Sequence, residues 1–273
     1  MGNRIRIAYL EHSAFAVDSN ETMLIFDYAR GAPPEGANEG QGYITPAFLE
    51  RYKRVYVFVS HGHGDHYERG IFDWRGHPGI EYILGYDIAD APAGRRMSPG
   101  DTAVFGNLSV TAHASTDIGV SFLIDWTETG YRVFHAGDLN LWHWRDESTL
   151  REIEQAERSF YDAVAPLVGS PADVAFFPVD PRQGALYDAG ATYFIAQTQP
   201  RFFIPMHWQG RADVAMDFAR RAGEKRTRII ALTTPGETIA IEKGENDESE
   251  ALRTLRAEPL GETLENRNII TEG

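Results

Sequence analysis

The stretch Val-Ser-His-Gly-His-Gly-Asp-His occupies residues 59–66 and decides how the rest of the chain is interpreted. It directly follows the apolar run 55–59, so a strand is predicted to end where a glycine-containing loop begins. Four side chains of the loop are of types that bind metal ions: His61, His63, Asp65 and His66. Imidazole and carboxylate groups are ligands for divalent ions such as zinc, so the loop predicts a metal site.

The composition limits the class of protein. The chain has 273 residues, of which 42% are hydrophobic, as is typical of a globular protein with a core. The absence of cysteine excludes disulfides, cysteine-ligated zinc and thiol nucleophiles. The formal net charge of -14 repels phosphate backbones, so nucleic acid is not expected as a partner. No apolar run has the length of a membrane span, and no signal core is evident, so we expect a cytoplasmic protein.

Hydrophobic patterns predict strands in the first half of the chain and alternating helices and strands in the second half. The predicted strands span residues 4–9, 14–17, 23–26, 55–59, 82–84, 102–105, 108–112, 120–126, 131–135, 173–177, 201–204, 228–232 and 238–241. The predicted helices span residues 46–52, 147–168, 189–198 and 212–222. The charged segment 243–273 is expected to be a tail or a surface helix beyond one domain of residues 1–242.

Three further ligand-type residues lie at the ends of predicted strands: His113, Asp138 and His207. Asp138 comes directly after a glycine, which permits close approach of the backbone, and this position suits a bridging carboxylate. Loops at strand ends are where the sites of α/β proteins collect, so these residues are expected near residues 59–66.

The motif His-x-His-x-Asp-His, followed by Ala-Gly-Asp138 and Pro-Met-His207, resembles the metallo-β-lactamase superfamily over residues 3–242. The resemblance implies an α/β fold of the αββα sandwich type, with two mixed β-sheets face to face and helices outside. It also implies two metal ions. The implied ligands of the first are His61, His63 and His113. Those of the second are Asp65, His66 and His207, with Asp138 bridging the two ions.

The third histidine is the point at which this chain departs from the family pattern. His113 stands in Thr-Ala-His-Ala-Ser, whereas the corresponding histidine of the family often follows a proline. Asp117, which lies a few residues later, is therefore kept as an alternative ligand or as a residue behind the ligands.

Within the superfamily, the chain is most similar to the branch that contains ascorbate-phosphate lactonase-like proteins and phospholipase-D-type phosphodiesterases. The segments that carry this likeness are His12-Ser-Ala-Phe, Asp27 after an early strand, and Ser-Thr-Asp117. His12 is expected to line the pocket. Asp27 is expected to accept a hydrogen bond from a metal-binding histidine, which fixes the direction of the ring.

Two clusters are predicted to contact substrate. Trp142, His143 and Trp144 follow Asp138 closely and are expected to form an aromatic wall, with ordinary core packing as the alternative. Asp180 and Arg182 follow the predicted strand 173–177 and are expected on the rim of the site. Arg182 suits a phosphate or carboxylate, and a structural ion pair is its alternative role.

The resemblance implies a hydrolase in which two metal ions activate a water molecule, with Asp65 and Asp138 as catalytic residues. Zn²⁺ is the expected ion, and Mn²⁺ also suits a ligand set of nitrogen and oxygen. The expected substrate is a small phosphodiester, lactone or ester, and a homo-oligomer is allowed. The alternatives are a nuclease, which would need a basic surface, and a non-catalytic metal-binding or regulatory protein of the same fold.

Overall fold

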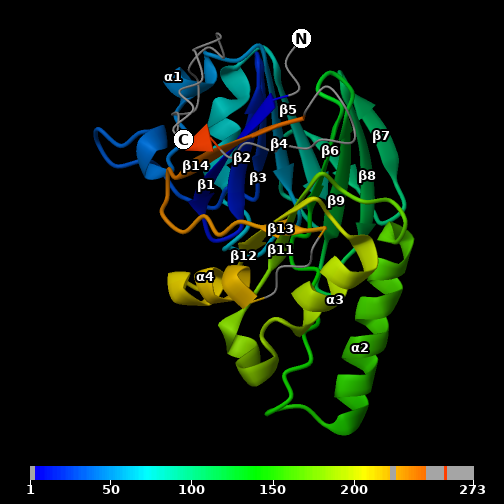
Figure 1. The fold of residues 1–273 in the computed structure, drawn as a ribbon. Coiled ribbons are helices and arrows are strands. Elements are labelled where there is room, and N and C mark those ends of the chain that lie inside the picture. The colour runs from blue at the N-terminus through cyan, green and yellow to red at the C-terminus, as the bar shows by residue number, and fades with distance from the viewer. Residues whose placement is uncertain (1–3, 222–225, 244–254, 257–273) are drawn as a thin grey trace.

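Two β-sheets lie face to face, and the helices cover their outer surfaces (Figure 1). The computed structural model describes residues 4–221, 226–243 and 255–256. Both sheets contain parallel and antiparallel pairs, so the predicted αββα sandwich is confirmed.

The first sheet has antiparallel strands at one side and parallel strands at the other. In spatial order its strands are β15 (Leu255–Arg256), β14 (Thr238–Glu242), β1 (Arg4–Glu11), β2 (Ala14–Ser19), β3 (Thr22–Phe26), β4 (Arg54–Val59), β5 (Ile80–Gly85) and β6 (Arg95–Met97). The metal-binding motif follows β4 and therefore leaves from the parallel part of this sheet.

The second sheet is an antiparallel meander that continues into parallel strands. In spatial order its strands are β13 (Arg228–Ile229), β12 (Phe202–Met206), β11 (Val174–Pro178), β10 (Tyr131–His135), β9 (Val120–Trp126), β8 (Leu108–Ala114) and β7 (Thr102–Phe105). Every residue of β11 and β12 is buried, as expected for parallel strands covered on both faces.

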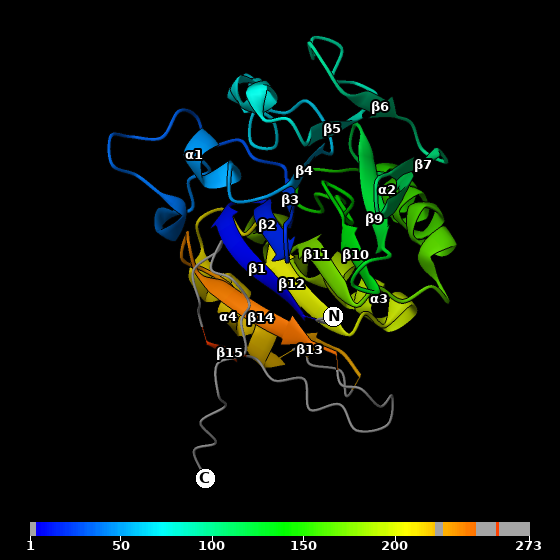
Figure 2. The ribbon, with the colours of Figure 1, turned by 90° about the horizontal axis from the view of Figure 1, so that it is seen from above.

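The helices complete the outer layers. They are α1 (Pro46–Leu49), α2 (Leu150–Val164), α3 (Ala189–Thr198) and α4 (Ala212–Arg221), with 3-10 helices at Glu39–Gln41, Arg69–Gly76, Ala165–Leu167 and Pro181–Leu186. Figure 2 shows α1 and α2 on opposite sides of the two sheets. Phenylalanines of α3 and α4 pack on the second sheet, with Phe194 5.2 Å from Phe134 and Phe218 5.6 Å from Phe203 between ring centroids. Among the described residues, no helix is both long and apolar enough to cross a membrane.

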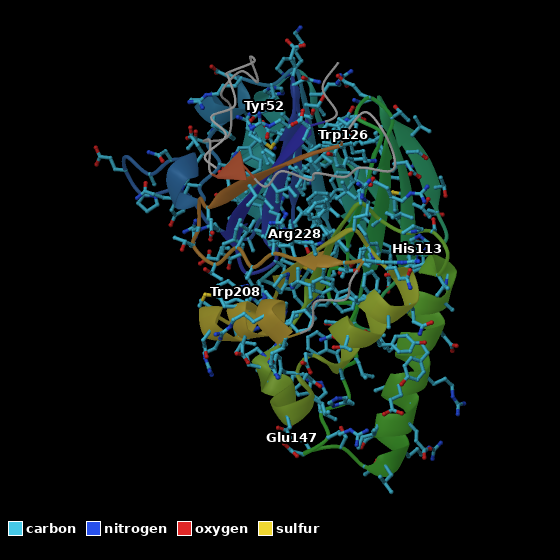
Figure 3. All side chains as sticks on the ribbon, viewed as in Figure 1. Tyr52, His113, Trp126, Glu147, Trp208 and Arg228 are labelled. Carbon is cyan, nitrogen blue, oxygen red and sulfur yellow. The ribbon has the colours of Figure 1, made fainter. Side chains whose placement is uncertain are left out.

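Aromatic side chains fill the space between the sheets. The ring centroids of Phe58 and Phe122 are 5.4 Å apart, and those of Phe15 and Phe176 are 4.4 Å apart. Trp126, which is labelled in Figure 3, is also fully buried. Burial of each such ring is worth about 1.5–3 kcal/mol, so this layer is the main source of stability.

Several element boundaries differ from the sequence-based predictions for local reasons. Helix α2 begins at Leu150 rather than at residue 147, because Thr149 caps it by accepting a hydrogen bond from the Glu152 N–H. Strand β8 continues to Ala114, beyond its predicted end. Strand β13 has two residues rather than five. The predicted tail falls outside the described residues except for Lys243 and the two residues of β15, so the domain boundary stays a prediction.

Candidate metal centre

The carboxyl ends of parallel strands meet at one edge of the sandwich and carry the polar residues of the site. Strands β3 and β4 are parallel neighbours, so Asp27 and Ser60, which directly follow their last residues, lie within hydrogen-bond distance. Strands β10, β11 and β12 are also parallel neighbours. The residues that follow them are Asp138, Asp180 and His207.

The backbone at this edge adopts conformations that non-glycine residues rarely take. His12, Asp27 and His207 have φ values of 51°, 42° and 59°. A left-handed conformation in such residues costs about 1–3 kcal/mol each and tends to cluster at functional sites. Gly137 has φ 53°, and a Cβ there would lie 2.6 Å from the Ser60 Cβ, so only glycine allows Asp138 to approach the motif.

Two groups of ligand atoms lie next to each other at this edge. The first group is His61, His63, Asp117 and Asp138, and the second is His12, Asp65, His66 and His207. Within each group all ligand atoms lie within 4.8 Å of one another. Asp138 Oδ2 is 3.6 Å from His61 Nε2, whereas Asp138 Oδ1 is 3.0 Å from His66 Nε2. Each oxygen of one carboxylate therefore faces a different group.

Several buried atoms of the site form no well-directed hydrogen bond within the described part of the chain, although some of them lie 3.0–3.3 Å from one another. They are His12 Nε2, His66 Nε2, His207 Nε2 and Asp138 Oδ1. Leaving a buried polar atom unpaired costs about 1–3 kcal/mol, so four at one point indicate a missing partner. Imidazole nitrogens and carboxylate oxygens are the donor set of a divalent ion, and the residues present therefore fit one.

Asp27 fixes the direction of two histidines. Its carboxylate accepts hydrogen bonds from His66 Nδ1 at 2.7 Å and from the backbone N–H and hydroxyl of Ser60, each at 2.7 Å. Because the Ser60 hydroxyl donates to Asp27, its oxygen accepts a hydrogen bond from His61 Nδ1, 2.9 Å away. Because Nδ1 of both rings is engaged, Nε2 of both is turned toward the other ligand atoms, with His61 Nε2 3.1 Å from His63 Nδ1, and can bind a metal ion.

Asp180 performs the same task for His207. Its Oδ2 lies 2.8 Å from His207 Nδ1 and 2.6 Å from Arg182 Nη2. Burial raises the pKa of Asp180, but hydrogen bonds from His207 and Arg182 outweigh burial and bring this pKa to about 2. The sequence predicts that Asp180 either contacts substrate or supports a ligand, and its hydrogen bond with His207 corresponds to the second of these roles.

Electrostatics hold the acids of the site ionised. Burial opposes the charged form of Asp138, yet His66 and His207 keep the pKa of Asp138 far below its usual value. The neighbouring His12, 3.3 Å away, lowers the pKa of Asp65. Ionised carboxylates are the form that binds metal, so Asp138 and Asp65 are in their metal-binding form at neutral pH.

A cavity of about 480 Å³ opens over the two groups, and we call it the tryptophan pocket. Its lining includes His63, Asp117, Trp142, Trp144, Arg182 and His207. The two indole rings stack with centroids 5.8 Å apart and an interplanar angle of 11°. Trp142 also donates from Nε1 to the Asp138 carbonyl oxygen at 2.7 Å. The predicted aromatic wall therefore lies over the metal centre.

His143 does not take part in this wall. His143 is not among the residues that line the cavity, and it is buried with neither ring nitrogen hydrogen-bonded to the described residues. Arg182 does line the tryptophan pocket, with 49% of its side chain exposed, and is also paired with Asp180. Both roles foreseen for Arg182 are thus compatible with its position.

Comparison with known proteins identifies the family. A family model described as "Beta-lactamase superfamily domain" matches residues 6–207. This chain belongs to the metallo-β-lactamase superfamily.

Two proteins named as metal-dependent hydrolases match this chain over nearly their whole length. A UPF0173 metal-dependent hydrolase of Heliobacterium modesticaldum is 25% identical over 256 residues, which cover 87% of this chain and 98% of the relative. One of Pyrococcus furiosus is 26% identical over 259 residues, covering 87% and 100%. Among solved structures, the metallo hydrolase Igni18 of Ignicoccus hospitalis has a TM-score of 0.60 with 18% identity, covering 88% and 100%, and this likeness concerns the fold.

The superfamily's third histidine was assigned to His113, and the structure requires a correction. Ala112 pairs with Phe122, whose ring contacts Phe58 of the other sheet, so this face of β8 points inward. Because side chains alternate along a strand, His113 points to the opposite face, where the helices pack. Figure 3 accordingly shows His113 on the side of α2 and α3. The alternative ligand, Asp117, lies 3.3 Å from His63 Nδ1 within the first group.

Two residues have larger roles than the sequence suggested. His12 was expected only to line the pocket, but it lies within ligand distance in the second group, and its ring centroid is 4.1 Å from that of His207. Ser60 was given no role, although it connects Asp27 to His61. Its position directly before the superfamily motif, between the strand and the first histidine, is the one signal that would have identified it.

Proposed function

We propose that this protein is a metal-dependent hydrolase that holds two divalent ions and acts on a small phosphodiester, lactone or ester. The observation that carries the proposal is Asp138, which offers one oxygen to each of two adjacent ligand groups. The superfamily match and the relatives named as metal-dependent hydrolases support it.

The described residues suggest how two ions would be held. His61, His63 and Asp117 would bind the first ion, and Asp65, His66 and His207 the second, with Asp138 between them. His12 would be a further ligand of the second ion. When bound, such ions lower the pKa of a water molecule and polarise a carbonyl or phosphoryl oxygen. The all-nitrogen and oxygen donor set suits Zn²⁺ and also accepts Mn²⁺.

The protein's own residues supply orientation and proton transfer. The side chain of Asp65 is 48% exposed, so the water molecule that attacks the substrate can reach its carboxylate. Its low pKa keeps it ionised, so it would orient the water and pass on its proton rather than hold it. The stacked rings of Trp142 and Trp144 would contact a planar or apolar part of the substrate, and Arg182 an anionic oxygen.

The nuclease alternative lacks support at the site. The lining of the tryptophan pocket contains one basic side chain, Arg182, and this residue is paired with Asp180. A surface for a nucleic-acid backbone needs several such side chains along a stripe. We therefore propose a small-molecule substrate.

Metal analysis and turnover test the proposal together. The purified protein is expected to contain about two equivalents of transition metal, and to hydrolyse bis-p-nitrophenyl phosphate or a member of a lactone and aryl-ester panel. Asp65→Asn keeps the size of the side chain and should reduce turnover sharply, whereas Asp162→Asn on the exposed face of α2 should not. Less than one equivalent of metal, with no added ion restoring turnover, would refute the proposal.

A further inference from the structure

A second cavity of about 460 Å³ lies beside the metal centre. We call it the ring pocket, and its aromatic and apolar lining is formed by Tyr9, Ala14, Ala29, Trp208, Ala212 and Pro235. Its volume is within the range of about 300–1,000 Å³ found for small-molecule sites. It is distinct from the tryptophan pocket, because the two cavities share only one of the described lining residues.

Asp65 is the residue that lines both cavities. His12 lines the ring pocket and belongs, with Asp65, to the second ligand group. The Tyr9 hydroxyl accepts a hydrogen bond of 2.8 Å from the His12 backbone N–H. A wall residue of the ring pocket is therefore joined directly to a residue of the second ligand group. The tryptophan pocket lies over the two ligand groups, and the ring pocket adjoins it at Asp65.

The walls of the ring pocket suit a flat apolar group. The rings of Tyr9 and Trp208 pack with centroids 5.5 Å apart, and Trp208 is 5% exposed (Figure 3 shows it beside α4). The lining also contains Ala14, Ala29 and Ala212, whose small side chains leave space in the cavity. The Trp208 Nε1 atom is buried without a hydrogen-bond partner in the described part of the chain. Such rigid aromatic walls bind rings through stacking and edge contacts.

The one arginine among the described residues that line the ring pocket, Arg30, is paired with a carboxylate. Arg30 Nε lies 3.0 Å from the Glu11 carboxylate, and Arg30 Nη1 donates to the carbonyl oxygens of Leu10 and Gln41 at 3.2 and 2.6 Å. The guanidinium also lies 3.7 Å from the centre of the Tyr43 ring. Because Arg30 is held and neutralised in this way, it leaves no free cation to attract an anionic group.

We propose that the ring pocket binds an uncharged, ring-bearing arm of the substrate, while the other arm lies in the tryptophan pocket. This inference rests on the proposed hydrolase function, because it places the scissile bond at the metal centre, near Asp65, where the two cavities adjoin. It narrows the substrate class to compounds with an aromatic or alicyclic group on one side of the bond that is cleaved.

Binding can be tested without turnover by titrating the protein with phenol and following the indole N–H signals by NMR. Single Trp→Phe variants assign the signals of Trp208, Trp142 and Trp144. We expect phenol to shift the Trp208 signal in a saturable way. Shifts confined to Trp142 and Trp144, or no saturable shift at all, would overturn the inference. Because no turnover is needed, this result is independent of whether the protein proves to be a hydrolase.

Selectivity gives the second test. Ala212→Trp places a large ring in the ring pocket, and Met216→Trp places the same ring on an exposed part of α4 that does not line it. For Ala212→Trp, the ratio of kcat/KM for phenyl over methyl p-nitrophenyl phosphate should fall about tenfold or more. Met216→Trp should leave this ratio unchanged. An equal ratio in the two variants would refute the role of the pocket even in an active hydrolase.

Discussion

At the scale of single residues, carboxylates behind the ligands determine what the ligands can do. Asp27 accepts hydrogen bonds from His66 and Ser60, and Asp180 accepts one from His207. The bonds to His66 and His207 occupy Nδ1 of each ring, and Ser60 occupies Nδ1 of His61. Nε2 of each ring is therefore directed at the centre. Such partners change metal affinity almost as strongly as the ligands themselves.

Asp138 is predicted to be the bridge between the two ions. Asp138→Ala should lose one of two metal equivalents and lower kcat by about 10²–10³-fold, because both groups share this carboxylate. The fold should survive, as judged by circular dichroism. Metal content by mass spectrometry checks the result, with the exposed Asp162→Ala as control. Unchanged metal stoichiometry in Asp138→Ala would contradict the bridging role.

Asp117 and His113 are predicted to differ in metal binding. Asp117→Ala should weaken the first site by about 10–100-fold, because a carboxylate beside His63 is removed. His113→Ala should retain full metal content, because its side chain faces the helices. Competition with a chromophoric chelator measures both affinities. If the two variants exchanged these outcomes, the original assignment of His113 would be restored.

Asp180 is predicted to act through His207. Asp180→Asn keeps the size of the side chain but removes the charge that holds Nδ1–H, so affinity at the second site should fall about 10–100-fold. The first site should keep its affinity, which a two-step metal titration resolves. Equal weakening at both sites would indicate general loss of structure, and no weakening would exclude the proposed orientation.

At the scale of elements, parallel pairing puts the site together and helix caps hold the outer layer. Strands β3 and β4 in one sheet, and β10, β11 and β12 in the other, all end at the same edge. The helices meet the sheets through apolar stripes, such as Ile153, Phe160 and Val164 of α2. The strand ends therefore determine metal binding and activity, whereas the helices contribute to the free energy of unfolding.

The cap of α2 provides a test of this separation. Thr149 and Glu152 exchange hydrogen bonds at the start of the helix, which satisfies two N–H groups that would otherwise be unpaired. Thr149→Ala should lower the free energy of unfolding by about 1 kcal/mol, measured by urea denaturation. Metal content and kcat should not change. A large loss of metal in this variant would contradict the separation.

At the scale of the whole molecule, the centre lies where the two sheets meet and draws its ligands from both. His12 and the motif of residues 61–66 follow strands of the first sheet, whereas Asp138 and His207 follow strands of the second. Two metal ions would therefore connect the halves of the sandwich. The unfolded chain has no such arrangement, so metal binding should favour the folded state.

Metal removal should accordingly destabilise the protein. An ion present at 100 times its Kd stabilises the folded state by about 2.7 kcal/mol, which corresponds to a Tm change of about 5–10 °C for a domain of this size. Scanning calorimetry with and without a chelator measures this difference. Asp138→Ala should show a smaller change than the native protein. An identical Tm with and without metal would mean that the centre does not connect the sheets.

The sequence by itself determined the fold class, the motif at residues 61–66, and Asp138 and His207, because ligand types with fixed spacing at strand ends are local features. It did not determine the face of a strand on which His113 lies, since a strand two residues longer than predicted changes a loop residue into one of the sheet. Only the tertiary structure brought His12 to the second ligand group, assigned Asp180 to His207, and opened the ring pocket. Those contacts join segments far apart in the chain, and their distances are set by how the two sheets pack rather than by any local pattern.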